Sequence, residues 1–155
     1  MRRLILGVAA ACAIVALTAS GAPAKNGNGV MCVLHARLTT TNETTGSTST
    51  ARGHTQIKVR ANGTIEFKTH ILNQDGETFV AGHIHQAPVG VAGPIVVPLF
   101  VSPTPATNAR HIRQSGVATP NADTTGAALC TNPSAYYVNY HTTAFTGGAI
   151  RGQLH

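Results

Sequence analysis

The sequence offers one obvious group of side chains with ligating or proton-transfer chemistry. His83 and His85 stand one residue apart in "AGHIH", just before a turn rich in Gly and Pro and the apolar run "PIVVPLF". Alternate residues of an extended strand share a face, so these two imidazoles would lie roughly 6.5 to 7 Å apart along it. At that spacing, both rings can turn toward a single ion.

A third histidine, in "YYVNYHT", is the best candidate to complete such a site. His141 belongs to an expected neighbouring strand, where alternation places it on the same face as Tyr137 and Asn139. Three imidazoles suit copper or zinc, so a metal site is one hypothesis. Two alternatives stay open: the rings form only hydrogen bonds, with the backbone or with Asn139 and Tyr137, or they do proton catalysis.

Other catalytic arrangements find little support in the sequence, which favours a role other than that of an enzyme. We expect all five acidic residues in turns or on exposed strand faces, so no carboxylate pair for acid-base work is visible. The chain has no serine in an elbow motif and no phosphate-binding glycine loop before a helix. Arg151 in "AIRGQL" is by default a surface arginine, and the alternative is a partly buried one that binds carbonyls or a carboxylate.

The elements that must position these residues all have the pattern of β-strands. Asn-Gly between two alternating runs predicts a hairpin over residues 54–72. Alternation over 78–85 puts Phe79, Ala81, His83 and His85 on one face, and Pro98 assigns the apolar run 94–101 to a sheet edge or a bulge. Further strands are expected near 31–41, 109–117, 135–142 and 149–155, and no helix is expected after residue 24. The fold class is therefore all-β, an antiparallel immunoglobulin-like or Greek-key sandwich or barrel.

The N-terminus has the layout of a secretory signal peptide over residues 1–24: a basic Arg2-Arg3 start, an apolar stretch and the small-x-small site Ala22-Pro23-Ala24. We expect one domain over 25–155, with its core from about 32 to 155, secreted or held in the periplasm or cell envelope, with no transmembrane segment once the peptide is removed. Cys32 and Cys130 remain after cleavage, and an oxidising compartment favours a disulfide between them over free thiols or metal ligands.

The charge pattern gives little indication of a partner. Removing the peptide leaves nine Lys and Arg residues against five acidic ones, and the nine are scattered singly along the chain. Without a basic run or interleaved aromatic residues, we expect no nucleic-acid partner. The extracellular or cell-envelope partner stays unknown.

Two separated blocks of the sequence together resemble the CHRD domain, a module named for its occurrence in chordin. The blocks are "GHIHQAPVGVAGPIVVPLF" and "YYVNYHTTAFTGGAIRGQL". Besides the three histidines and Leu99, the positions that match the family pattern are Gly90, Gly93, Pro94, Tyr137, Val138, Asn139, Thr142, Ile150, Arg151, Gly152, Gln153 and Leu154. The order His-x-His followed by a later His also resembles the copper site of copper-zinc superoxide dismutase, although this chain shows no bridging His-Asp set of that kind.

The chain departs from the family pattern at two places. Ala87 stands where the family usually has Gly, which alters the loop beside His85. Thr146 and Ala149 stand in the last turn where the family has Pro and Glu, which removes an acid that could pair with Arg151. The resemblance implies a secreted, all-β, non-catalytic binding or structural module without a defined partner, and the competing hypothesis is a copper- or zinc-binding protein that uses the three histidines.

Overall fold

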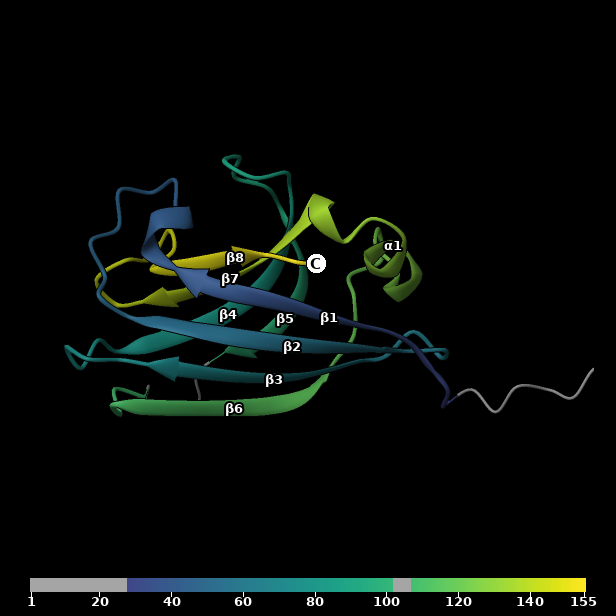
Figure 1. Cartoon of the computed structure of the whole chain (residues 1–155), viewed down its shortest axis with the longest axis horizontal. Helices are drawn as coiled ribbons and strands as arrows, with labels where there is room; N and C mark the ends of the chain where they lie inside the picture. Colours follow the sequence, from purple (N-terminus) through teal and green to yellow (C-terminus); the bar gives the residue numbers. More distant parts are fainter. Residues whose placement is uncertain (1–27, 102–106) are drawn as a thin grey trace, which may run out of the picture.

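The protein is an eight-stranded antiparallel sheet that curls into a flattened barrel (Figure 1). A computed structural model describes residues 28–101 and 107–155. The strands are β1 (Val30–Thr39), β2 (Arg52–Arg60), β3 (Ile65–Leu72), β4 (Phe79–Gln86), β5 (Ile95–Val101), β6 (His111–Ala118), β7 (Tyr136–Thr142) and β8 (Ile150–Gln153). This architecture confirms the expected all-β, antiparallel class. The expected signal peptide, 1–24, lies outside the described residues, and the single-domain boundaries stay a prediction.

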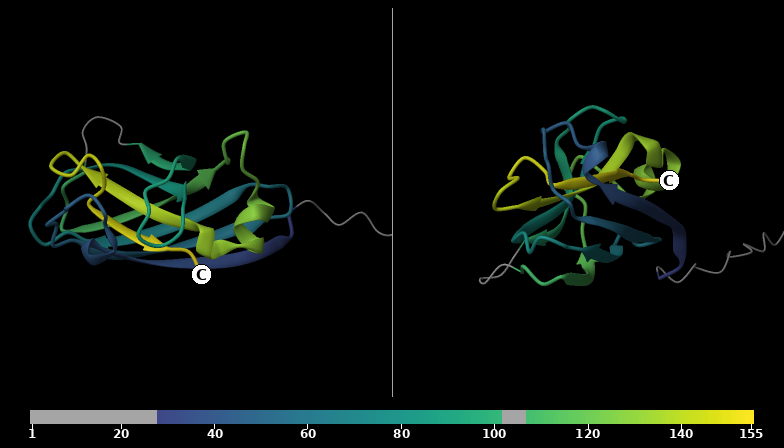
Figure 2. Two further views of the ribbon diagram at one scale, coloured as in Figure 1. Left: turned by 90° about the horizontal axis from the view of Figure 1, so that it is seen from above. Right: turned by 60° about the vertical axis from the view of Figure 1, so that its left-hand side comes forward.

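The strand order is β5-β4-β7-β8-β1-β2-β3-β6, so the two strands at the edges are β5 and β6. They approach each other across the curled sheet, and no backbone pairing joins them within the described part of the chain. Figure 2 shows the sheet from above and from one end, with the strands wrapped around a common interior. Pro98 lies in the edge strand β5, as the sequence predicted, because proline has no backbone N–H to donate and an edge strand needs donors on one side alone.

The barrel interior holds one continuous core. Inward side chains from all eight strands contribute to it, among them Leu38, Ile57, Ile71, Ile84 and Tyr140, each fully buried. The β2–β3 hairpin follows the sequence prediction, with its turn at Asn62-Gly63 and Gly63 at φ +85°. Alternation on both strands places Thr55 and Thr69 inside, where their hydroxyl groups bond each other at 2.8 Å.

Three features differ from what the sequence predicted. Phe79 was expected beside the histidines but lies in the core, because a register shift between Phe79 and Ala81 reverses the alternation there. A six-residue helix, α1 (Gly126–Thr131), was not expected at all, and Thr125 caps it by accepting a bond from the Ala128 amide. Short 3-10 turns also occur, η1 at Thr40–Asn42 and η2 at Pro133–Ala135.

Cys130, in α1, forms the disulfide with Cys32 of β1 that the cysteine pair predicted. The two residues are 98 positions apart. Closing a loop of that length restricts the unfolded chain and, in the chain-entropy model, adds about 4.7 kcal/mol to the free energy of unfolding. Within the described residues, none of the helices has the length and apolar character that crossing a membrane requires.

Candidate functional site

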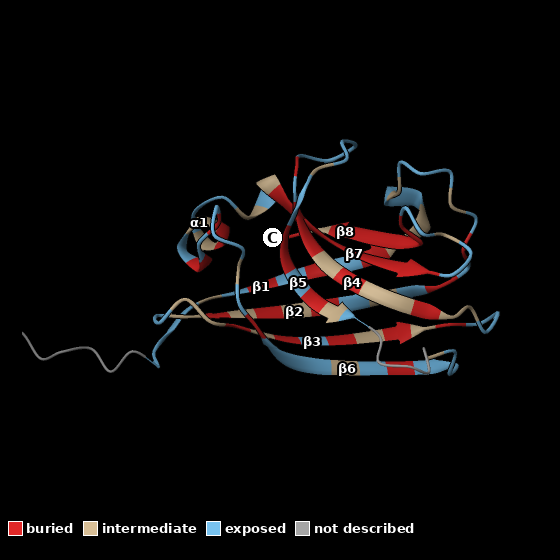
Figure 3. Ribbon diagram, turned by 180° about the vertical axis from the view of Figure 1, so that it is seen from behind, coloured by how far each residue is buried: buried red, intermediate tan, exposed pale blue. Residues whose placement is uncertain are grey.

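The candidate site lies on the outer face of β4, β7 and β8, which the loops at both ends of these strands cover. The central strand of the three, β7, is buried along its whole length (Figure 3). Its inward side chains, such as Val138 and Tyr140, belong to the core, while Tyr137, Asn139 and His141 point outward. The cross-strand register sets His83 of β4 opposite Asn139, and Asn139 opposite Arg151 of β8.

The structure brings together His83, His85 and His141, which are called the site histidines below. One ring nitrogen from each lies within 4.8 Å of the others. The closest pair is His83 Nδ1 and His141 Nε2, 3.1 Å apart, which form a hydrogen bond in the absence of an ion. Nitrogens that share a tetrahedral zinc at 2.0 to 2.1 Å are about 3.3 Å apart, so this pair already has the separation of two ligands and the third must move inward.

Backbone carbonyls fix the orientation of two of the three rings. His85 Nδ1 lies 2.9 Å from the Gly93 carbonyl oxygen, and His141 Nδ1 lies 2.9 Å from that of Thr146. A carbonyl only accepts, so both Nδ1 atoms carry the proton, and in the neutral rings both Nε2 atoms present a lone pair. Carbonyl acceptors of this kind commonly orient histidine ligands in metal sites.

The lone pair of His85 Nε2 has no partner. This atom is buried and forms no hydrogen bond, and the whole residue is only 8% exposed. An unpaired buried acceptor costs roughly 1 to 3 kcal/mol. A cation placed among the three rings would bind the lone pair of His85 Nε2. The hydrogen bonds of the site leave this lone pair without a partner.

All three imidazoles are held neutral. Burial, followed by the neighbouring rings of His141 and His85, lowers the pKa of His83 to about 4. Burial also lowers the pKa of His85 and of His141, against the opposing effect of their carbonyl partners. Neutral imidazole is the form that binds metals, so protons do not compete for these nitrogens near pH 7.

Stacked side chains extend from His85 across the site. The His85 ring lies flat against Tyr137, with ring centroids 4.9 Å apart and an interplanar angle of 10°. The Arg151 guanidinium carbon lies 4.4 Å from the centroid of the same ring. Tyr137 also accepts a hydrogen bond from the Gly93 amide through its hydroxyl group. The stack therefore holds both His85 and the loop that orients it.

Arg151 is buried, with only 3% of the residue exposed, so the second of its two interpretations is the one the structure supports. It donates to the carbonyls of Asn42, after β1, and Val91, after β4, so that it ties two loops to β8. Gln153 extends this role by donating to the carbonyls of Ala87 and Ser134.

The glycines and proline of the sequence motif shape the loop between β4 and β5. Gly90 adopts φ +80°, a left-handed turn that favours glycine. A Cβ on Gly93 would collide with the Gln86 carbonyl, while the Pro94 carbonyl accepts from the Gln86 amide. Elsewhere, Gly152 allows β8 to approach Arg37 of β1. The contacts of Gly90, Gly93 and Pro94 bring the Gly93 carbonyl to His85.

One of the five acidic residues expected in turns or on exposed strand faces is buried near the site. Glu43 follows η1 in a polar loop, yet both oxygens of its carboxylate are buried. Burial raises its pKa to about 7, although Arg151 lowers it. A Cβ on Gly148 would lie 2.6 Å from Asn139 Nδ2 and 2.9 Å from each Glu43 oxygen, so Glu43 approaches the same outer face. Nothing in the alternation or motif pattern of the loop marks this residue.

Thr142, the remaining motif residue, accepts a hydrogen bond from the Phe145 amide and shapes the turn that carries Thr146. The polar and glycine residues of the motif thus surround one site or support its loops, while Leu99, Val138, Ile150 and Leu154 belong to the core. In comparisons with known proteins, no curated protein and no solved structure matched this chain. The family model of the CHRD domain matches residues 34–154, from the first core strand to the end of the site, and the chain belongs to the CHRD domain family.

Proposed function

We propose that this domain is a non-catalytic module that works outside the cytoplasm and binds one copper or zinc ion through His83, His85 and His141. The CHRD family supports an extracellular module without a catalytic role, and the Cys32–Cys130 disulfide is consistent with an oxidising compartment. The sequence favoured a binding or structural role with an undefined partner over metal binding. The geometry of the three rings supports the addition of metal binding to that role.

The observation that carries the proposal is the buried, unpartnered Nε2 of His85. It belongs to a group of three ring nitrogens within 4.8 Å, two of whose rings already donate their other nitrogen to a carbonyl. In a purely structural cluster of hydrogen bonds, most buried acceptors are paired, so the unpaired Nε2 at the centre of this group supports an ion. The donor set of three imidazoles is typical of zinc and copper sites, not of magnesium or calcium, which prefer oxygen.

Elemental analysis of the protein recovered from its native compartment tests the proposal. We expect about one copper or zinc ion per chain, and a lower melting temperature after a chelator removes it, because an ion that binds only the folded state at 100 times its Kd adds about 2.7 kcal/mol. The double variant His83→Ala/His141→Ala should lose the ion. As a matched control, His54→Ala/His70→Ala removes two histidines from another part of the barrel and should keep it.

Two results would contradict the proposal. One is the absence of a stoichiometric transition metal together with an unchanged melting temperature in the chelator. The other is the same metal content in the His83→Ala/His141→Ala variant as in the unaltered protein.

A further inference from the structure

A second set of polar residues lies on the other side of the barrel, on the outer face of β1, β2, β3 and β6. These basic residues are scattered in the sequence, but strand pairing gathers them. Arg37 lies opposite His54, His54 opposite His70, and His70 opposite Arg113. Three strand spacings separate the two arginines, roughly 14 Å. The four residues form a cross-strand row, called the basic row below.

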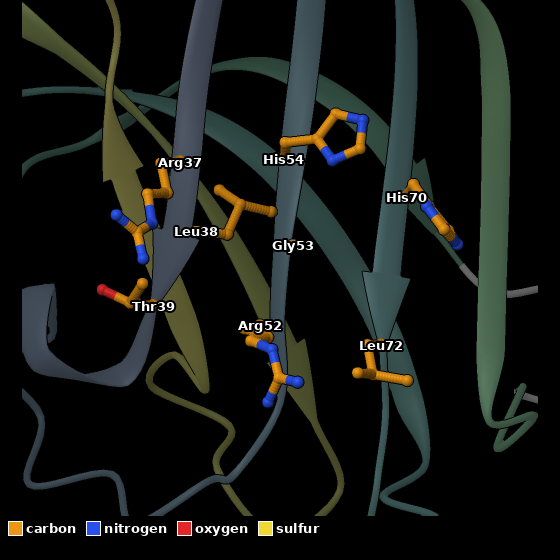
Figure 4. A pocket seen from close by; sticks show the side chains of 8 residues that line it. All are labelled: Arg37, Leu38, Thr39, Arg52, Gly53, His54, His70 and Leu72. Atoms are coloured by element: carbon orange, nitrogen blue, oxygen red, sulfur yellow. The ribbon is translucent and has the colours of Figure 1, made fainter.

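Two hollows flank this row and share His54 and His70. One, of about 250 Å³, also includes Arg37 and Arg52 (Figure 4). The other, of about 320 Å³, also includes Lys68, Arg113 and Ser115. Arg37, Arg52, Lys68 and Arg113 are all exposed. Each hollow therefore combines two permanent positive charges with histidine side chains.

The positive charge of this face is not compensated. Glu66 is the one acidic residue at an outward position of the four strands, and it already pairs with Lys58 at 3.8 Å and Arg60 at 2.6 Å. Within residues 28–101 and 107–155, Arg37, Lys68 and Arg113 form no ion pair. The face thus carries excess positive charge in a chain that, without residues 1–24, has nine Lys and Arg residues against five acidic ones.

We propose that this face binds a linear acidic polysaccharide. Neutral hydrogen-bonding side chains, Thr39, Gln56 and Ser115, alternate with the cations at outward positions. This mixture complements a chain in which sulfate or carboxylate groups alternate with hydroxyl groups. The row across four strands lets several acidic groups pair at once, which multiplies weak individual contacts.

Nucleic acid and membrane surfaces fit the face less well. The outward positions of these four strands hold no Phe, Tyr or Trp on which unpaired bases could stack. The most exposed apolar side chain of these strands, Val117, lies two rows from the basic row, so the basic row itself holds no apolar side chain to insert into lipid.

Binding to heparin, a sulfated chain, and polygalacturonate, a carboxylated one, tests the proposal, with neutral dextran as the control polymer. We expect the full protein to bind at least one of the two acidic polymers at low salt and to lose affinity steeply as NaCl is added. The variant Arg37→Ser/Lys68→Ser/Arg113→Ser should bind about 30-fold more weakly. Its circular dichroism and melting temperature should be unchanged, because all three side chains are exposed.

Arg113→Ser and Arg110→Ser form a matched pair, since both remove one exposed arginine and only the first lies on the basic row. Arg113→Ser should weaken binding several-fold, and Arg110→Ser less than twofold. Equal effects of the two substitutions, or an unchanged triple variant, would overturn the proposal by showing attraction to net charge alone. Tighter binding to duplex DNA or to phosphatidylglycerol vesicles than to both polysaccharides at the same salt would overturn it as well, and so would equal binding to dextran.

Discussion

The barrel carries two groups of three histidines, and they differ in what surrounds them. The site histidines lie under loops, with two Nδ1 atoms bound to carbonyls and the ring nitrogens turned toward one point. The other group, His54, His70 and His111, is called the face histidines here and lies on the open face of β2, β3 and β6. Their ring centroids are 5.8 and 6.0 Å apart between neighbours, and no carbonyl orients them within the described residues.

In the proposed metal site, the loops that orient the rings distinguish the site histidines from the face histidines. His70 resembles His85 in having a buried Nε2 without a partner. Its pKa, however, is lowered by desolvation and then by Arg113, and that permanent cation would repel a metal ion. At the site histidines the nearest arginine, Arg151, instead directs its guanidinium to the carbonyls of Asn42 and Val91 and to the Tyr137 ring. Histidines therefore suit a cation at the site histidines, where the arginine is directed elsewhere, and an anion at the face histidines, where Arg113 lies beside them.

The largest effect on zinc affinity in this comparison is expected from a change to Tyr137, which holds the His85 ring and its loop. Tyr137→Phe keeps the ring stack but removes the hydroxyl group that accepts from the Gly93 amide. The Gly93 carbonyl should then orient His85 less firmly, and zinc affinity should fall about 10-fold, the lower end of the range for outer-shell partners of a ligand. Competition titration against a zinc-binding dye measures this.

Tyr140→Phe is the matched control, because it removes a hydroxyl group from the inward side of the same strand. Tyr140 donates to Thr69 at 2.8 Å inside the core, so its loss should lower the free energy of unfolding by about 1 kcal/mol and leave zinc affinity unchanged. If the two substitutions changed zinc affinity equally, the loop would not be the source of the site's geometry.

A smaller effect is expected from the buried carboxylate beside the site. Glu43 has a pKa of about 7 in the folded protein and an ordinary value of 4.5. Between these values the folded chain holds a proton that the unfolded chain has released, so the free energy of unfolding decreases as the pH rises through this window. Glu43→Gln removes that loss, and the variant should gain stability relative to the unaltered protein at pH 8 but not at pH 4.5.

His83 acts in the opposite sense, which makes the pH dependence of Glu43→Gln a sharp measurement. Its pKa is about 4 when folded against an ordinary 6.5, so the unfolded chain gains the proton first and stability decreases as the pH falls from about 6.5 to 4. Urea unfolding of Glu43→Gln should therefore show a steeper loss of stability toward acid than the unaltered protein. Parallel pH profiles of the two proteins would contradict the burial of the Glu43 carboxylate.

The sequence predicted the positions of the strands more completely than it predicted which groups would surround their side chains. Alternation and Asn-Gly identified the β2–β3 hairpin, and period two placed His141 on the face that Tyr137 and Asn139 share, because these patterns are local. Phe79 was misplaced because a bulge adds one residue without a mark in the sequence. The helix α1 was missed because six residues are too few for a periodic pattern.

The parts of the site that depend on loops were beyond sequence reasoning. Glu43 comes from a polar segment after β1, and it reaches Asn139 and Gly148 only because β1 pairs with β8 at Thr39 and Arg151. The carbonyls of Gly93 and Thr146 are backbone atoms, so the residue types in the sequence do not indicate their role. Likewise, the basic row consists of single charges that only the register of four strands brings together.

The most direct test of the central claim identifies the nitrogen atoms that an added zinc ion contacts. Long-range ¹H–¹⁵N correlation spectra of the histidine rings, recorded as one equivalent of zinc is added, distinguish Nδ1 from Nε2 in each ring. The account predicts that Nε2 of His85, Nε2 of His141 and Nδ1 of His83 shift, while the face histidines do not. Zinc-dependent shifts at Nδ1 of His85 or His141, or at the face histidines in place of the site histidines, would contradict it.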